Sequence, residues 1–329
     1  MRRFRNRGLG IGISAVILAL LLTACGQDSA AENKAAEGKV KVITTIYPLA
    51  DFVRNIGGDH VYVSNLVPAG VEPHDWSPKS RDMKNIEEGR LFIYNGAGFE
   101  GWVSDFLHNI PADSKLKTLE ASKGIKLIST AEHTEEEHTD EHAEEEHGVE
   151  NEHDHLANDP HTWTSPASAL IMAQNIMNAL VQADPANETD YKANYEAYKA
   201  KLAALDAKFR TDLGKAAKKD IVVSHQAFGY LARDYGLNQV SIMGLSPDAE
   251  PRGQDLLEIA TFVKEHKVRY IFFEELVSDR LAKTLAAEAG VETLVLNPVE
   301  GITEEQEKKG EDYISLMNGN LQNLLKALQ

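Results

Sequence analysis

The sequence of 329 residues contains a single cysteine, Cys25, and this scarcity excludes two kinds of structure. Neither a disulfide framework nor a zinc site built on thiolates can form within a chain that has one thiol. Basic residues are also in the minority, with 34 Lys and Arg against 51 Asp and Glu and a formal net charge of -17. Without a basic stripe to neutralise phosphates, the chain is not expected to bind nucleic acid. A cation is the better-matched partner.

Long apolar runs are absent except near the N-terminus, where residues 8–22 follow four arginines. This order is typical of an export signal, which we predict over residues 1–24, and it is too short for a comfortable membrane span. Leu22, Thr23 and Ala24 precede Cys25 as in a bacterial lipobox, which predicts cleavage before Cys25 and lipid on its sulfur. Residues 25–38 are small and polar, as suits a tether. The alternative is a plain signal peptide with a leftover thiol.

Basic residues are missing altogether from an acidic segment in the middle of the chain. Between Glu132 and His155 there are twelve Asp or Glu, six His and no Lys or Arg. Such a segment buries too little apolar surface to offset its ordering entropy, so we predict a mobile loop over residues 132–158. Imidazole and carboxylate are ligands that zinc prefers, and the loop is therefore a candidate low-affinity metal-binding segment. A solvated acidic linker is the alternative. The candidate ligands in the loop are His133, His138, His142, His147, His153 and His155.

Strand and helix patterns alternate on both sides of one long helix. β-branched strands followed by helical segments predict an α/β lobe with a mostly parallel sheet flanked by helices over residues 39–184, and a second such lobe over residues 219–329. Between them, residues 185–218 carry large apolar side chains at intervals of three and four residues, which predicts an amphipathic helix. At about 1.5 Å per residue this helix is on the order of 45 Å long. We therefore expect it to join the two lobes.

Three isolated histidines fall in loops with turn chemistry. His74 follows the second predicted strand, His161 follows the acidic segment, and His225 comes directly after a strand at residues 220–224. In open α/β sheets, ligands bind beyond the carboxyl ends of the strands. No single helix could present these histidines, so any shared site must be assembled in the cleft between the lobes. From the residues alone, Glu274 and Glu275 are plausible carboxylates for such a site, since they follow the strand at residues 268–273.

Longer motifs surround these histidines, and together they resemble the zinc-binding lipoproteins of bacterial ABC importers. The motifs are PAGVEPHDWSP at 68–78, DPHTW at 159–163, SHQAFGY at 224–230, IMGLSPDAEP at 242–251 and LNPVE at 296–300. The resemblance covers residue 40 to the C-terminus, and it implies two α/β lobes bridged by one long helix, with the metal in the cleft. It further implies His74, His161 and His225 as ligands, with Glu300 as the fourth. The residues alone leave Glu274 or Glu275 equally plausible in that role.

The ligand set that the resemblance implies bears on the function. Three imidazoles and one carboxylate suit four-coordinate zinc, whereas manganese favours more oxygen ligands. In the manganese-binding branch of the family, a carboxylate is usual at the position of His225. A filled shell leaves no open position for a reactive water, which argues against an enzyme. Asp75 and Asp159 are candidates for fixing the imidazole tautomers.

The resemblance therefore implies a monomeric, lipid-anchored receptor that captures Zn²⁺ outside the cytoplasmic membrane and delivers it to an ABC permease and its ATPase. A manganese receptor or a metal-binding adhesin of the same fold remains an alternative. An exported zinc hydrolase with Glu274 or Glu275 as general base is another, although no H-E-x-x-H motif is present. Residues 96–101 match the dinucleotide pattern G-x-G-x-x-G, with Glu120 about twenty residues on. Because they follow the third strand, we interpret them as a tight turn.

Overall fold

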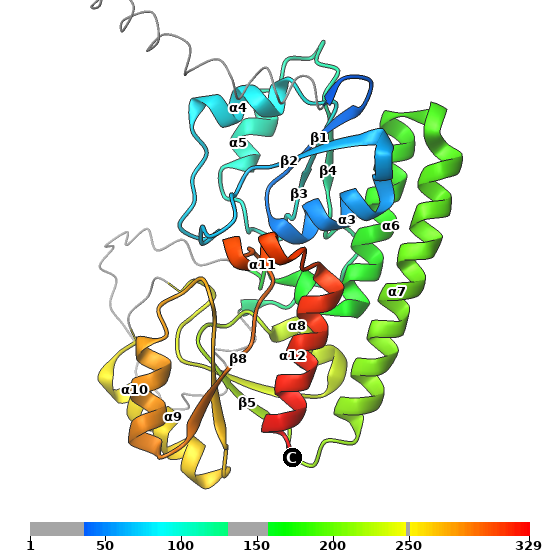
Figure 1. Ribbon diagram of the computed structural model, residues 1–329. Coiled ribbons are helices and arrows are strands. Elements are labelled where there is room, and N and C mark those ends of the chain that lie inside the picture. The colour runs from blue at the N-terminus through cyan, green and yellow to red at the C-terminus, as the bar shows by residue number, and fades with distance from the viewer. Residues whose placement is uncertain (1–35, 131–156, 248–250) are drawn as a thin grey trace, which may run out of the picture.

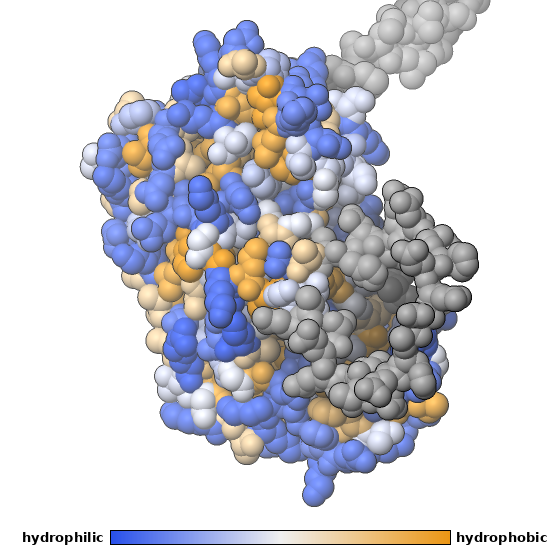
Figure 2. All heavy atoms as spheres, turned by 180° about the vertical axis from the view of Figure 1, so that it is seen from behind, coloured by the Kyte–Doolittle hydropathy of each residue, from blue (hydrophilic) through white to orange (hydrophobic). Residues whose placement is uncertain are grey.

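The computed structural model describes residues 36–130, 157–247 and 251–329. Within these ranges the chain forms two α/β lobes that lie one above the other beside a pair of long helices (Figure 1). The predicted export signal, Cys25, most of the tether and the six histidines of the acidic segment lie outside the described residues. Figure 2 shows the opposite face, where hydrophilic residues cover much of both lobes and hydrophobic residues gather in patches.

The first sheet is entirely parallel, with the strand order β2-β1-β3-β4. Successive side chains of a strand point to opposite faces. Val42 therefore faces the main core, and Ile43 packs in a smaller cluster on the other side. Figure 1 places α3 on one side of this sheet and α4 and α5 on the other. The strands and helices of this lobe are β1 (Val40–Thr44), α3 (Tyr47–Gly57), β2 (Val61–Asn65), α4 (Ser80–Glu87), β3 (Leu91–Tyr94), α5 (Val103–His108) and β4 (Lys117–Glu120).

The second sheet is also parallel and repeats this arrangement with the order β6-β5-β7-β8. Val222 and Ile271 face a core formed with α9 and α10, whereas Ile221 and Phe272 face the main core. The two parallel-sheet lobes confirm the predicted fold class. The elements of this lobe are β5 (Asp220–Val223), α8 (Gly229–Tyr235), β6 (Asn238–Ser241), α9 (Gly253–Glu265), β7 (Tyr270–Phe273), α10 (Arg280–Ala289) and β8 (Glu292–Val295).

One helix runs along both lobes. The 27 residues of α7 (Glu188–Gly214) span roughly 40 Å. This helix packs against α6 (Pro166–Ala183), α3 and α12 (Tyr313–Ala327). Its inward face is apolar and buried, and it joins a hydrophobic core that is continuous from the first lobe to the second. The residues of that face are Tyr191, Tyr195, Tyr198, Leu202, Leu205, Phe209 and Leu213.

Two elements escape the sequence patterns. Strand β4 lies at the edge of its sheet and reads KTLE, so it lacks the apolar run that identifies a buried strand. Helix α11 (Glu304–Lys309) reads EEQEKK and has no apolar face. It forms because Thr303 and Gln306 make a capping box at its start and because two i,i+4 ion pairs join Glu304 to Lys308 and Glu305 to Lys309.

The glycine pattern at residues 96–101 forms a tight turn after β3. Gly96, Ala97 and Gly98 all have positive φ, at 80°, 54° and 90°. The carboxylate of Glu100 closes the turn by accepting the backbone N–H of Asn95 at 2.8 Å and of Gly96 at 3.0 Å. A Cβ at Gly96 would lie 2.4 Å from the side chain of Glu120, which therefore packs against the turn. The backbone conformation and this packing account for the glycines, in agreement with the interpretation of residues 96–101 as a tight turn.

Candidate metal centre

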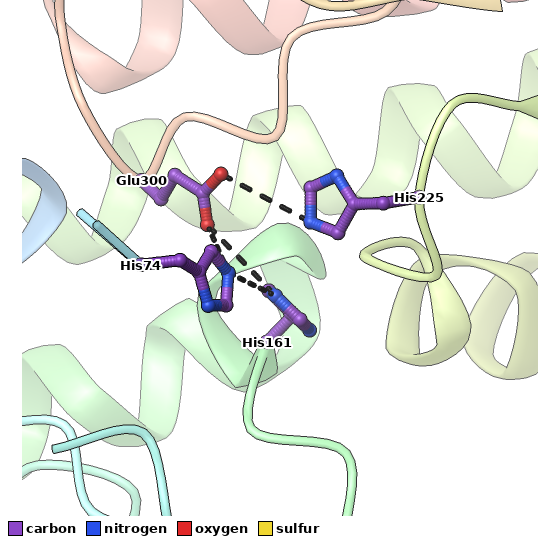
Figure 3. Close-up of side chains that lie close together, drawn as sticks. All are labelled: His74, His161, His225 and Glu300. Atoms are coloured by element: carbon purple, nitrogen blue, oxygen red, sulfur yellow. Dashed lines mark hydrogen bonds and ion pairs between the residues drawn. The ribbon is translucent and has the colours of Figure 1, made fainter. Parts of the chain in front are cut away.

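Four side chains that are distant in sequence meet at the junction of the lobes. His74, His161, His225 and Glu300 each offer a ligand atom, and these atoms lie within 4.8 Å of one another. Figure 3 shows the three imidazoles and the carboxylate pointing toward a common centre. The structure thus brings together the three histidines found in turn-rich loops and the carboxylate that the resemblance adds.

The distances between the side-chain nitrogen and oxygen atoms of the cluster are short. His74 Nε2 lies 3.2 Å from His161 Nε2 and 3.3 Å from Glu300 Oε2. Glu300 Oε2 lies 3.8 Å from His161 Nε2, and Glu300 Oε1 lies 4.0 Å from His225 Nε2. Three of the side chains are at most 1% exposed, whereas His74 is 8% exposed. The cluster is therefore almost completely buried, and His74 is its most exposed member.

Each lobe supplies two of the four side chains. In the first lobe, His74 stands in the loop between β2 and α4, and His161 immediately precedes the short 3₁₀ helix Thr162–Thr164. In the second lobe, His225 follows β5 and Glu300 follows β8. Both sheets direct the carboxyl ends of their strands toward this junction, where ligand sites of α/β proteins form.

Two of the imidazoles are oriented by buried carboxylates. His161 Nδ1 lies 2.9 Å from Asp159 Oδ1, which also accepts the backbone N–H of His161. His225 Nδ1 lies 2.7 Å from Glu274 Oε1. A neutral ring that donates its Nδ1–H to a carboxylate presents a lone pair on Nε2, and in both rings Nε2 faces the cluster. Asp159 therefore holds His161 as expected, whereas Asp75 is exposed and Glu274 holds His225.

The charged environment differs between these two histidines. Burial lowers the pKa of His161, and this effect outweighs the opposing contribution of Asp159. Burial also lowers the pKa of His225, but the charge and hydrogen bond of Glu274, together with the charges of Glu300 and Glu72, outweigh burial and raise the pKa to about 9. His225 is therefore the more basic of the two, and a cation that binds its Nε2 displaces a proton at neutral pH.

Glu300 is a buried carboxylate without hydrogen-bond donors among the described residues. Both of its oxygens are inaccessible to solvent and accept no hydrogen bond there, and His225 Nε2 is equally unpartnered. Burial alone raises the pKa of Glu300, but the neighbouring histidines, His74 above all, lower it to about 2. A buried anionic carboxylate that accepts no hydrogen bond is costly, and a cation held between these atoms would offset that cost.

Sequence reasoning missed a further carboxylate beside the cluster. It also left Glu274 or Glu275 as a possible fourth ligand, whereas neither belongs to the four side chains that converge. Glu72 Oε1 accepts the backbone N–H of His74 at 3.2 Å, and burial together with the charge of Glu300 raises the pKa of Glu72 to about 8. Glu274 stands behind His225, and Glu275 accepts from Asn297 Nδ2 at 2.8 Å. The position of Glu72 two residues before His74 is the only signal in the sequence that could have pointed to it.

Comparisons with known proteins agree with this architecture. Residues 42–327 match the family described as zinc-uptake complex component A, periplasmic. The high-affinity zinc uptake system protein ZnuA of Bacillus subtilis is 43% identical over 310 residues, which cover 94% of each chain. The zinc-binding protein AdcA of Streptococcus pyogenes is 42% identical over 297 residues, which cover 89% of this chain and 57% of that protein. The present chain thus spans little more than half of the longer relative.

A solved structure has the same arrangement of lobes. The Zn(II)-bound ZnuA-like domain of Streptococcus pneumoniae AdcA superposes with a TM-score of 0.74 at 38% identity, over 88% of this chain and 99% of that domain. The match extends over both lobes and is not confined to one motif. On the combined evidence of family, relatives and fold, the chain belongs to the zinc-uptake complex component A family.

Proposed function

We propose that the protein is a high-affinity receptor that captures Zn²⁺ outside the cytoplasmic membrane and delivers it to an ABC permease for uptake. The observation that carries this proposal is the convergence of three imidazoles and one buried carboxylate, which accepts no hydrogen bond from the described residues, on a centre shared by both lobes. The names of the related zinc-uptake and zinc-binding proteins support the same cargo. A permease and its ATPase are the partners that such a receptor needs.

The donor set supports zinc as the cargo and argues against manganese. Nitrogen ligands from His74, His161 and His225 with one oxygen from Glu300 match the four-coordinate preference of zinc. Manganese favours a shell with more oxygen atoms. With all four positions taken by side chains, no place remains for a reactive water, so binding and release are better supported than catalysis. A receptor is thus a better account of the site than a hydrolase.

Anchoring by lipid at Cys25 completes the proposal. No helix among residues 36–130, 157–247 and 251–329 is long and apolar enough to cross a membrane. A diacylated cysteine followed by a short polar tether would hold the receptor at the outer surface of the cytoplasmic membrane. In an organism with an outer membrane, this surface faces the periplasm. We also propose that the histidines between residues 132 and 158 collect zinc at low affinity beside the cleft.

The proposal can be tested in cells with one pair of variants. A strain that lacks the receptor is complemented with the parent chain, with His225→Ala or with His266→Ala. His266 is exposed at the end of α9, where its ring bonds Asp220 and stacks on Phe262, so it serves as the matched control. Growth in zinc-depleted medium should be restored by the parent and by His266→Ala, but not by His225→Ala. Full restoration by His225→Ala would contradict the proposal.

A further inference from the structure

The chain segment that carries Glu300 belongs in sequence to the second lobe, yet it is bonded to the first. Within this segment, the carbonyls of residues 298, 300 and 302 each accept a hydrogen bond from the first lobe. Trp163 Nε1 donates to Pro298 O at 2.8 Å, the backbone N–H of Tyr47 donates to Glu300 O at 3.3 Å, and that of Gly70 donates to Ile302 O at 2.8 Å. The position of Glu300 is therefore set by both lobes together.

Trp163 is the side chain that makes this connection. It is fully buried, and it lies two residues after His161 and packs edge-to-face against that ring at 5.4 Å. Its own carbonyl accepts the hydroxyl of Tyr313 at 2.7 Å, so α12 also fixes its position. One residue thus contacts the imidazole of a ligand in the first lobe and holds the backbone next to the carboxylate of the second.

The backbone beside Glu300 is held in an unfavourable conformation. Val299 has a φ of 58°, in the left-handed region that β-branched residues rarely adopt. The side chain of Asn297 stabilises the turn, because its Oδ1 accepts the backbone N–H of Val299 at 2.7 Å. Asn320 of α12 in turn bonds both the N–H and the carbonyl of Asn297, at 2.8 and 2.6 Å. The surrounding hydrogen bonds therefore hold Val299 in a backbone conformation that is intrinsically unfavourable for valine.

We propose that Trp163 and the left-handed Val299 are positioning residues that fix the Glu300 carboxylate opposite His161, and that this fixed geometry underlies zinc affinity and discrimination against manganese. The inference rests on the proposed function, because it concerns the site where zinc would bind. A rigid, closely spaced set of four ligands suits an ion with a small tetrahedral shell and disfavours one that needs a wider shell with more oxygen atoms. Residues that touch no metal would then determine which metal the site accepts.

The first variant removes a single hydrogen bond. Trp163→Phe keeps an aromatic ring against His161 but cannot donate to Pro298 O. Tyr191→Phe is the matched control, because it also removes one hydrogen bond from a fully buried aromatic side chain, the bond to Asp184 at 2.7 Å near the start of α7. We expect Trp163→Phe to raise the zinc dissociation constant about tenfold, the size of one buried hydrogen bond, while the control leaves it unchanged. The preference for zinc over manganese should narrow as well, and the visible absorption of bound Co²⁺, which reports a four-coordinate shell, should weaken.

A second pair of variants separates positioning from stability. Val299→Ala removes the two γ-methyl groups and Val299→Gly removes Cβ as well, but only glycine adopts a positive φ without strain. Val299→Gly should therefore melt a few degrees higher than Val299→Ala, even though glycine normally lowers stability relative to alanine. It should nevertheless bind zinc several-fold more weakly, because the segment that bears Glu300 gains freedom. The order of the two variants in Tm and in zinc affinity is thus expected to be opposite.

The outcomes distinguish this inference from the proposed function. If the parent chain binds no zinc, the proposed function fails whatever the variants do. If the parent binds zinc and Trp163→Phe lowers only the Tm, with zinc affinity, metal preference and cobalt absorption unchanged, the positioning role is wrong and the proposed function stands. Equal zinc affinity in Val299→Gly and Val299→Ala would likewise overturn the role of the left-handed turn.

Discussion

The two sheets have the same strand order, but their lobes carry the candidate zinc ligands on connections of different length. In the second lobe, His225 lies two residues after Val223, where β5 ends, and Glu300 lies five residues after the last residue of β8. In the first lobe, His74 lies nine residues after the last residue of β2, and His161 lies forty-one after the last residue of β4. Short connections let the sheet itself place a ligand, whereas long ones need other supports.

The supports differ accordingly. His225 is held by Glu274, which comes from the segment after the adjacent strand β7, so the sheet places both partners. His161 is held by Asp159, only two residues away, and by the packing of Trp163 beside it. The second lobe therefore positions His225 through the geometry of its sheet. The first lobe positions His161 through a local turn, which a hydrogen bond from Trp163 connects to the second lobe. Substitutions in the two lobes test this difference.

The largest effects on zinc binding are expected from removal of the proposed ligands that are buried. His161→Ala and His225→Ala should each raise the zinc dissociation constant on the order of a thousandfold, more than the 10- to 100-fold typical of a lost outer partner. His74→Ala should cost less, since His74 is 8% exposed and water can take its place. Competition titrations with a chelator of known affinity measure all three. If either buried histidine variant weakened zinc binding less than His74→Ala, the expected order of the three ligands would be wrong.

Loss of the carboxylate partners should have intermediate effects. Glu274→Gln and Asp159→Asn remove the negative charge that each imidazole ring faces, and each is expected to weaken zinc binding about 10- to 100-fold. Glu258→Gln, an exposed change in α9, is the control and should leave affinity unaltered. Isothermal titration with zinc provides the measurement. Unaltered affinity in both partner variants would mean that the rings are oriented by packing alone.

The last prediction concerns the stability of the contact between α3 and α7, not zinc affinity, and it depends on pH. Asp51 in α3 is buried against α7, where it accepts the hydroxyl of Tyr198 at 3.1 Å, and burial raises its pKa to about 6. This value lies above the usual one near 3.9, so the folded chain binds an extra proton between about pH 4 and 6. Stability therefore falls as pH rises through this window and stays lower above it.

Replacement of this carboxyl should remove that dependence. Asp51→Asn is expected to increase the free energy of unfolding by about 2 kcal/mol at pH 8 and by much less near pH 4. Denaturant titrations at the two pH values measure the difference, with the exposed Asp113→Asn as control. If the variant were less stable than its parent at pH 8, ionised Asp51 would stabilise the contact between α3 and α7, and the prediction would be wrong.

Much of the fold could be predicted because it depends on local patterns. Alternating strands and helices indicated both sheets, and the spacing of buried residues in α7 indicated one long helix. Strand β4 and helix α11 were missed, since one is a polar edge strand and the other is held by caps and ion pairs. Both lack the apolar periodicity on which such predictions depend.

The site was harder to predict in full, because its supporting contacts are distant in sequence. The three histidines stood out as isolated residues in loops, and Glu300 emerged only through the resemblance of its motif. The pairing of His225 with Glu274 joins residues 49 apart, and the bond from Trp163 to Pro298 joins residues 135 apart. No spacing rule within one chain identifies such pairs, since they depend on how the two lobes meet.

The most direct test of the central claim is to count bound metal on residues 26–329 and on the same chain without residues 132–155. Both proteins are offered equal zinc and manganese, and the bound metal is counted by mass spectrometry. One tightly bound zinc in both proteins, lost in His225→Ala, is the predicted result, because the proposed ligands at the junction lie outside the deleted segment. Loss of all tight zinc with the deletion would mean that the acidic segment is the binding element, and it would contradict a site shared by the two lobes.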